Sequence, residues 1–292
     1  MDFNKYYEDR QKLVNTFLEK RLEKKGISRV DEAMAYSLLA GGKRIRPIIL
    51  MATADALGVS GYNFLPVACG LEMIHTYSLI HDDLPCMDDD EYRRGRLTNH
   101  KVFGEALALL AGDALLTLAF EVMLEQKNVP AEALVETVRE VAMCAGNFGM
   151  VGGQVIDLDS EGRQISEEEL RKLHAGKTGA LFIAAVRSGA RLSGAASDEL
   201  LALTKFADLL GLAFQITDDI LDVEGDAAQM GKAAHSDEKK HKSTYVTLYT
   251  LEGAKALAQK TVDEALGCLE MFGENAEALR EITKMMLSLI HI

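Results

Sequence analysis

The sequence predicts a globular, largely helical protein, and three observations support that prediction. Apolar residues make up 48% of the 292-residue chain and charged residues 26%, which is enough to build a sizeable core. Only four prolines occur, so few points force a long helix to break. Apolar residues recur at helical spacing almost throughout, whereas alternating strand-like patterns are nearly absent. With no linker-like stretch and no internal repeat, residues 1–292 are expected to form a single domain.

Turn signals divide the chain into its expected helices. They fall at Gly26, Gly41-Gly42, Gly58 to Gly61, Gly152-Gly153 and Gly162, where glycine permits a change of direction. The longest polar stretch is EGDAAQMGKAAHSDEKKHK at 224–242. Its length and polarity predict a mobile loop or lid.

Charge and cysteine content narrow the class of protein. The net charge of −13 argues against a nucleic-acid partner, because phosphate backbones are bound by clustered Lys and Arg. The four cysteines form no CxxC pair, which is typical of reduced thiols in a cytoplasmic protein. The first residues lack the apolar core of a signal peptide. The most apolar run, ALALLAGDALLTLAF at 106–120, contains Asp113 and is expected to be too short for stable membrane insertion.

The first acidic cluster is HDDLPCMDDDEYRRGR at 81–96, directly after the apolar run PVACGLEMIHTYSLI. Carboxylates this close repel one another, and burying them without partners is costly. His75, Ser78 and Asp82 fall along one helical stripe. Pro85 then makes a regular helix hard to continue, which would let Asp88 swing back toward Asp82.

The second acidic cluster is FQITDDILDVEG at 214–225. Asp218 and Asp222 are four residues apart and share a helical face, whereas Asp219 is expected to point elsewhere. Phe214 and Gln215 lie one turn earlier on the same side as Asp218. The opposite, inward face is predicted to carry Ile216, Ile220 and Val223.

Either cluster alone is typical of a solvated helix end. Both clusters, however, follow apolar helical runs, where repulsion between the carboxylates would be unfavourable unless cations bind. Oxygen ligands with open positions favour Mg²⁺ bridged to substrate phosphates over a closed Ca²⁺ cage. Basic residues are present to complete such a site. They are Lys43, Arg44 and Arg46 of GGKRIRP, then Arg93, Arg94, Lys177, Lys232 and Lys242.

Taken in order, GGKRIRP, EMIHTYSLIHDDLPCMDDDEYRRG, GMVGGQ, KTGALF, FQITDDILD, GK and KSTY resemble the trans-isoprenyl diphosphate synthase family, and within it the bacterial farnesyl diphosphate synthases. The resemblance covers nearly the whole chain. It implies an all-α bundle of ten or more antiparallel helices around a deep central cavity, in a homodimer. The implied reaction condenses dimethylallyl or geranyl diphosphate with isopentenyl diphosphate, with Mg²⁺ assisting ionisation.

The resemblance also implies a role for each matching residue. Several Mg²⁺ ions, three with the allylic substrate bound, would be held by Asp82, Asp83, Asp88, Asp218 and Asp222. The allylic diphosphate would meet Arg93, Lys177, Lys232 and Lys242. Isopentenyl diphosphate would meet Gly42, Lys43, Arg46, His75 and Arg94. Thr178 and Gln215 would face the allylic cation, and Phe214 would pack along the homoallylic substrate.

Product length is implied by Tyr77 and Ser78, one turn before Asp82. An aromatic residue at the position of Tyr77, together with the Pro85-Cys86 insertion, goes with C15 product in the resembling family. On helix geometry alone, Tyr77 could equally be a tyrosine packed between helices. The chain departs from the family at Val246, where Pro is frequent, and in its terminal MMLSLIHI, which replaces a basic tail.

Other activities stay open at this point. A geranylgeranyl or geranyl diphosphate synthase is the first alternative, and in the resembling family smaller residues at the position of Tyr77 go with C20 product. A terpene cyclase would need no site for isopentenyl diphosphate, so GGKRIRP, His75 and Arg94 speak against it. A non-catalytic partner subunit or acidic cation-binding protein is disfavoured by the presence of both Asp-rich motifs.

Overall fold

A computed structural model describes residues 1–23, 28–224 and 242–288. Its elements are α1 (Phe3–Glu23), α2 (Arg29–Leu38), α3 (Ile45–Ala56), η1 (Gly61–Phe64), α4 (Leu65–Asp82), β1 (Tyr92–Arg93), β2 (Arg96–Leu97), α5 (Asn99–Phe103), α6 (Glu105–Leu124), α7 (Ala131–Ala145), α8 (Met150–Ser160), α9 (Glu167–His174), η2 (Ala175–Gly179), α10 (Ala180–Leu192), α11 (Ser197–Glu224), α14 (Tyr245–Gly267), η3 (Glu270–Ala276) and α15 (Glu277–Ser288). The predicted all-α bundle of ten or more helices is confirmed.

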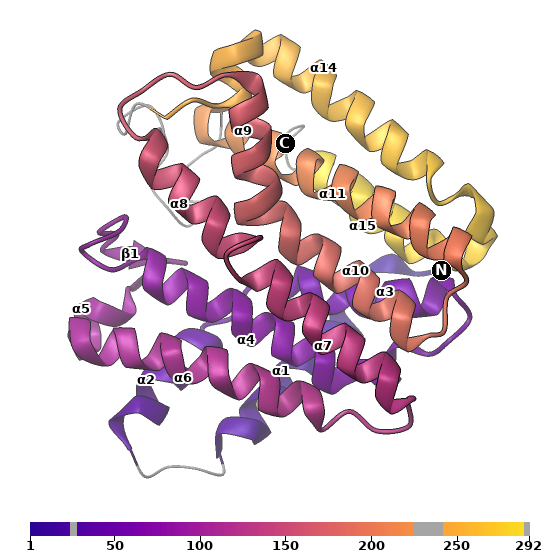
Figure 1. Ribbon diagram of the computed structural model, residues 1–292, viewed down its shortest axis with the longest axis horizontal. Helices are drawn as coiled ribbons and strands as arrows, with labels where there is room; N and C mark the ends of the chain where they lie inside the picture. The colour runs from indigo at the N-terminus through magenta and orange to yellow at the C-terminus, as the bar shows by residue number, and fades with distance from the viewer. Residues whose placement is uncertain (24–27, 225–241, 289–292) are drawn as a thin grey trace.

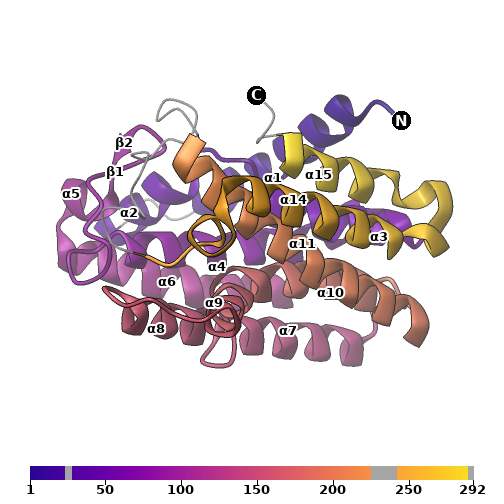
Figure 2. The same cartoon turned by 90° about the horizontal axis from the view of Figure 1, so that it is seen from above.

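The helices pack lengthwise in neighbouring pairs (Figures 1 and 2). Helix α4 runs along α6, α11 runs along α14, and α10 contacts α3, α7 and α11. The β1–β2 hairpin pairs Tyr92 with Leu97 and Arg93 with Arg96, and it contains the last residues of the first acidic cluster. Buried apolar side chains from most of the helices form one large core, and a smaller cluster lies around α9, α11 and α14.

Helix α4 is buried over most of its surface, so it needs small residues where α6 crosses it. A Cβ at Gly70 would lie 2.6 Å from Met123 Cγ, and one at Gly112 would lie 2.1 Å from His81 Nε2. These glycines therefore allow α4 and α6 to approach closely. Helix α4 ends at Asp82, before Pro85 as predicted, and the Asp88 backbone N–H donates to the Asp82 carbonyl at 2.9 Å.

The segment η2 is one turn of π-helix between α9 and α10. Glycines from two other helices fit around it. A Cβ at Gly153 of α8 would lie 2.0 Å from the Lys177 backbone nitrogen, and one at Gly211 of α11 would lie 2.9 Å from Gly179 Cα. Gly153 and Gly211 thus set how closely α8, η2 and α11 meet.

Three expectations about the elements need correction. Gly152 and Gly153 lie inside α8 instead of at a turn, because Gly153 lies against the backbone of η2 and Gly152 against the backbone of Asn147. Val223 is 41% exposed instead of buried. The run 106–120 is part of the 20-residue α6, which, like α11, is long and apolar enough to cross a membrane by length and composition alone. The core helix of a water-soluble protein passes the same test, and α6 buries one side against α4.

Candidate active site

A cavity of about 1040 Å³ opens between the two halves of the bundle. Most of the predicted site residues line it. From the α3–α4 side come Gly42, Lys43, Arg46, His75, Tyr77, Ser78, Asp82, Asp88, Arg93 and Arg94, and from the opposite side come Lys177, Thr178, Phe214, Gln215, Asp218 and Lys242. Fold packing therefore brings together residues up to 200 positions apart in the sequence.

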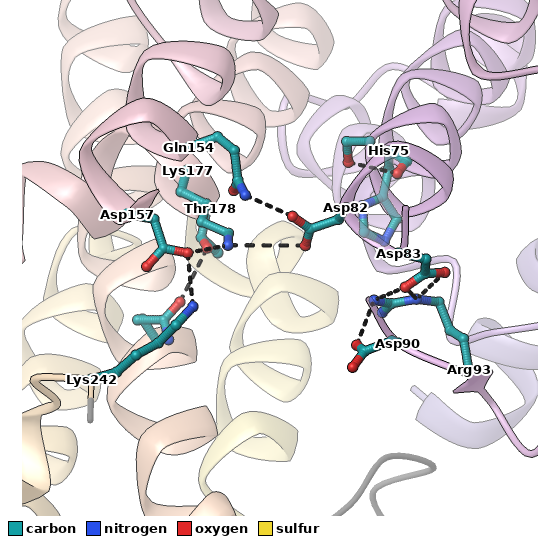
Figure 3. A network of polar contacts seen from close by, with 12 residues as sticks. His75, Asp82, Asp83, Asp90, Arg93, Gln154, Asp157, Lys177, Thr178 and Lys242 are labelled. Carbon is teal, nitrogen blue, oxygen red and sulfur yellow. Dashed lines mark hydrogen bonds and ion pairs between the residues drawn. The ribbon is translucent and has the colours of Figure 1, made fainter. Parts of the chain in front are cut away.

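Asp82 is held from the far side of the cavity (Figure 3). Gln154 Nε2 donates to Asp82 Oδ1 at 2.7 Å, and Lys177 Nζ lies 3.9 Å from Asp82 Oδ2. Burial raises the pKa of the Asp82 carboxyl above its ordinary value, whereas the Lys177 ammonium opposes that rise. A site in which burial disfavours the charged carboxylate is one that gains from a bound cation.

Asp83 turns away from Asp82 and forms an ion pair with Arg93 (Figure 3). Arg93 Nε lies 2.7 and 2.9 Å from the two Asp83 oxygens, and Arg93 Nη2 lies 2.6 Å from Oδ1. Burial raises the pKa of Asp83 to about 6 despite this contact. Asp83 lines a small adjoining pocket instead of the main cavity, so its geometry supports a role in orienting Arg93. The assignment of Asp83 as a metal ligand has no geometric support here.

The second acidic cluster differs from the helical-face prediction. Asp218 lines the cavity as expected, but the neighbouring carboxylate that also lines it is Asp219. Gln215 Nε2 donates to Asp219 Oδ1 at 3.0 Å, and the Tyr245 backbone N–H donates to Oδ2 at 2.8 Å. Asp222 is buried and outside the cavity lining. The expectation that Asp219 points elsewhere is wrong, because residues 242–244 line the cavity and the start of α14 holds the Asp219 carboxylate beside them.

Two residues of α8 belong to the site although the sequence analysis assigned them no role. Gln154 holds Asp82, and Asp157 Oδ2 accepts hydrogen bonds from Lys177 Nζ at 2.6 Å and Lys242 Nζ at 3.0 Å. Burial opposes ionisation of Asp157, but Lys177 and Lys242 outweigh it and hold the pKa of Asp157 below its ordinary value. The signal in the sequence is their spacing of three residues, which places both side chains on one face of α8.

The basic end of the cavity is built around GGKRIRP. A Cβ at Gly42, where φ is +123°, would lie 2.6 Å from Arg94 Nη1, so only glycine lets the Arg94 guanidinium rest against this turn and donate to the Gly41 carbonyl. Arg46 stacks on the Phe182 ring at 4.9 Å, and burial lowers the pKa of Arg46 to about 10. Burial, together with the neighbouring arginines, holds the pKa of His75 well below its ordinary value.

Arg44 is the one member of the GGKRIRP cation set that forms a buried structural ion pair. Arg44 Nη1 lies 2.8 Å from Glu72 Oε1, and its other nitrogens donate to Asn15 and to the Leu38 carbonyl. Both partners of the ion pair are almost fully buried. Arg44 therefore ties α4 to the turn that carries Gly42 and Lys43.

The donor set fits Mg²⁺ brought in with phosphate oxygens. Carboxylates stand on two walls of the cavity, Asp82 and Asp88 on one and Asp218 and Asp219 on the other. Within residues 1–23, 28–224 and 242–288, no three acidic, His or Cys side chains converge into a ready-made metal site. Mg²⁺ is commonly held by one or two carboxylates plus substrate phosphates and water, which is the arrangement these walls allow.

Some expectations fall outside the described residues. They concern Lys232, most of the predicted lid at 224–242 and the last four residues of MMLSLIHI. Val246 is described and lies in the first turn of α14, two residues after the Thr244 cap, whose side chain accepts from the Thr247 backbone N–H at 3.1 Å.

Comparisons with known proteins agree with this site. Residues 27–286 match the family model described as polyprenyl synthetase. The chain is 43% identical to a farnesyl diphosphate synthase of Geobacillus stearothermophilus, with 100% of this chain and 99% of that protein aligned. It is 46% identical to a geranylgeranyl diphosphate synthase of Cyanophora paradoxa over 89% of this chain and 87% of that protein.

The fold has a close counterpart among solved structures. A structure described as an FPP/GFPP synthase from Zymomonas mobilis superposes with a TM-score of 0.88 at 36% identity, covering 98% of this chain and 99% of that one. The bundle and its cavity define an isoprenoid synthase fold. The chain belongs to the polyprenyl synthetase family.

Proposed function

We propose that this protein is a short-chain trans-prenyltransferase that condenses dimethylallyl and geranyl diphosphate with isopentenyl diphosphate and releases mainly farnesyl diphosphate. The observation that carries the proposal is one cavity with two facing acidic walls and a separate basic end. Two charged subsites suit two diphosphate substrates, one held through cations and one held by Lys43, Arg46 and Arg94 directly. The whole of residues 1–292 is taken as one catalytic domain.

In the proposed reaction the allylic C–O bond breaks, and its electron pair leaves with the diphosphate. Bound Mg²⁺ supplies Lewis acidity and charge neutralisation for that leaving group. Lys177, Lys242 and Arg93 add positive charge around it. Thr178 Oγ1 donates to Gln215 Oε1 at 3.1 Å, so this pair presents oriented oxygen dipoles to the allylic cation. The isopentenyl double bond then forms the new C–C bond, and a proton passes to the departing diphosphate.

A product of C15 length is proposed from the cavity wall beyond Asp82. Tyr77 and Ser78 both line the cavity, and Ser78 Oγ donates to the His75 carbonyl at 2.8 Å. Tyr77 is nearly buried and meets the His81 ring edge-on at 5.6 Å. A braced aromatic ring on this wall would stop the growing chain, because a bulky side chain without free volume behind it cannot move aside.

A homodimer is proposed from exposed apolar side chains on α6, α7, α8 and the turn between α7 and α8, which together are taken as one apolar surface. They are Leu110, Met143, Phe148, Val151 and Val155, with Phe148, in the turn, 84% exposed. Exposed apolar patches of this kind mark interaction surfaces. A second copy of the chain is the proposed partner, and a cytoplasmic location is proposed with it.

The second candidate is a synthase of longer product, and the similarity to a geranylgeranyl diphosphate synthase is the observation that favours it. Incubation with Mg²⁺, radiolabelled isopentenyl diphosphate and dimethylallyl or geranyl diphosphate tests the proposal. Label in a C15 alcohol after dephosphorylation supports it, and mainly C20 replaces it with the second candidate. Incorporation of no label overturns prenyl transfer, and conversion of farnesyl diphosphate alone to a hydrocarbon would indicate a cyclase.

A further inference from the structure

Two lysines from different elements meet on a single carboxylate oxygen in the cavity wall. Lys177 Nζ and Lys242 Nζ lie 2.6 and 3.0 Å from the same Asp157 Oδ2 (Figure 3). Lys177 comes from the π-turn η2, and Lys242 lies just before α14. Because both ammonium groups lie within 3.0 Å of one oxygen, they would repel each other without an anion between them. The negative charge of Asp157 therefore allows the two lysine side chains to lie close together.

The position of Asp157 is fixed independently of the lysines. It lies on α8, one turn after Gln154, which holds Asp82. Gly153 of the same helix is in backbone contact with η2, where no Cβ would fit. Helix α8 is thus set against η2 by main-chain packing. Because Asp157 is only 8% exposed, its carboxylate has little freedom to move.

We propose that Asp157 is a positioning residue that holds Lys177 and Lys242 together at the allylic diphosphate subsite before the substrate arrives. This inference deepens the proposed function and rests on it for the identity of that subsite. Preorganised cations cost no reorganisation when charge develops on the leaving diphosphate. Asp157 would act through the two lysines and would not itself touch the substrate.

Asp157 has two possible effects on the cavity, and they predict opposite results when its charge is removed. If Asp157 only reduced the positive charge of the cavity, its neutralisation would strengthen binding of an anion and leave turnover intact. If it positions the lysines, Asp157→Asn lowers kcat, and its effect shrinks once Lys242 is already removed. A matched control is Asp159→Asn, an exposed carboxylate on the same helix.

The first measurement needs no activity. Competitive acetylation of the folded protein, read for each lysine by mass spectrometry, reports how strongly each amine is held. Asp157→Asn is expected to raise the labelling rates of Lys177 and Lys242 by about threefold or more, as loss of an ion pair would, and Asp159→Asn to leave them unchanged. Unchanged rates in Asp157→Asn would overturn the inference, whether or not the protein proves to be a prenyltransferase.

The second measurement uses turnover of geranyl and isopentenyl diphosphate by wild type, Asp157→Asn, Asp157→Glu, Lys242→Gln and the Asp157→Asn/Lys242→Gln double variant. Asp157→Asn is expected to lower kcat by about 10- to 100-fold, as loss of a supporting contact does, with the KM for isopentenyl diphosphate unchanged and partial rescue by Asp157→Glu. The cost of Asp157→Asn should be smaller in the Lys242→Gln background. Equal costs in both backgrounds, or a kcat near wild type, would refute the positioning role, whereas an inactive wild type would refute only the proposed function.

Discussion

At the scale of single residues, the site is explained by what each polar group contacts. Asp82 faces the cavity, where it contacts Gln154 and Lys177 of the opposite wall. Asp83, one position later, forms an ion pair with Arg93 instead. Adjacent aspartates in one motif thus have different partners. Helical periodicity correctly placed Asp82 and Asp218 on the cavity. It placed Asp222 on the cavity in place of Asp219, because α11 is packed on more than one side and both carboxylates are buried, so one helical face does not define the cavity lining.

Tyr77 gives a prediction about product length. Replacing Tyr77 by Ala removes the ring that meets His81 and opens the cavity wall. The product should lengthen by one five-carbon unit, because the space left by a phenol ring accommodates further chain. Chromatography of the dephosphorylated products checks it, with Ser193→Ala, directly after the end of α10 and outside the cavity lining, as a control. Unchanged C15 product from Tyr77→Ala would remove Tyr77 as the stop.

His174 gives a prediction about stability and pH. Burial lowers the pKa of His174 to about 3, whereas the unfolded side chain titrates near 6.5. Between these values the unfolded chain binds a proton that the folded protein does not, so the free energy of unfolding falls as pH drops below about 6.5. His174 alone should lower the free energy of unfolding by about 2 kcal/mol between pH 7 and pH 5.

Urea unfolding at pH 7 and pH 5 measures this effect. His174→Gln should lose less stability over the interval than wild type does, although its stability at pH 7 is lower. His81→Gln serves as a comparison, since His81 is partly exposed. The same loss in His174→Gln and wild type would show that His174 does not carry the pH dependence.

At the scale of elements, glycines decide which helices can meet. The sequence interpretation treated Gly152-Gly153 as a turn, because glycine often ends a helix. In the fold Gly153 sits within α8 and touches the backbone of η2. A local pattern cannot reveal such a contact, because the partner backbone lies more than twenty residues away. Asp157 was missed for the same reason, since its partners follow 20 and 85 positions later.

Gly153→Ala tests the element-scale account. Its Cβ would lie 2.0 Å from the Lys177 backbone nitrogen, so α8 and η2 must separate. The variant should lose about 1–3 kcal/mol of stability, as overpacked sites do, and most of its activity, because Gln154 and Lys177 move apart. Thermal unfolding and turnover check both. Gly267→Ala, where a Cβ meets nothing within 4 Å, should leave both unchanged, and a fully active, stable Gly153→Ala would contradict the account.

At the scale of the whole molecule, the bundle places two acidic walls and one basic end around one cavity. The all-α class follows from the sequence because helical periodicity is local. The pairing of α4 with α6 and of α11 with α14 follows from side-chain shape across the core, which no single segment contains. The apolar surface over α6, α7 and α8 is likewise a property of several helices together.

That surface predicts the oligomeric state. A Phe148→Asp/Val155→Asp variant places two charges on the proposed dimer interface and should sediment as a monomer, whereas wild type should sediment as a dimer. Leu201→Asp, at an exposed position on α11, is the matched control and should remain dimeric. A monomeric wild type in analytical ultracentrifugation would show that the surface has another role.

The central claim is that both acidic walls hold one allylic diphosphate through Mg²⁺. Its most direct test is the rate of isopentenyl diphosphate incorporation by wild type, Asp82→Ala and Asp218→Ala, with Mg²⁺ and after chelation by EDTA. Chelation should abolish wild-type turnover and added Mg²⁺ should restore it, while each variant keeps its helical circular dichroism and loses turnover by about 10²-fold or more, as removal of leaving-group stabilisation does. An Asp218→Ala protein that turns over at the wild-type rate, or a wild type indifferent to EDTA, would contradict the claim.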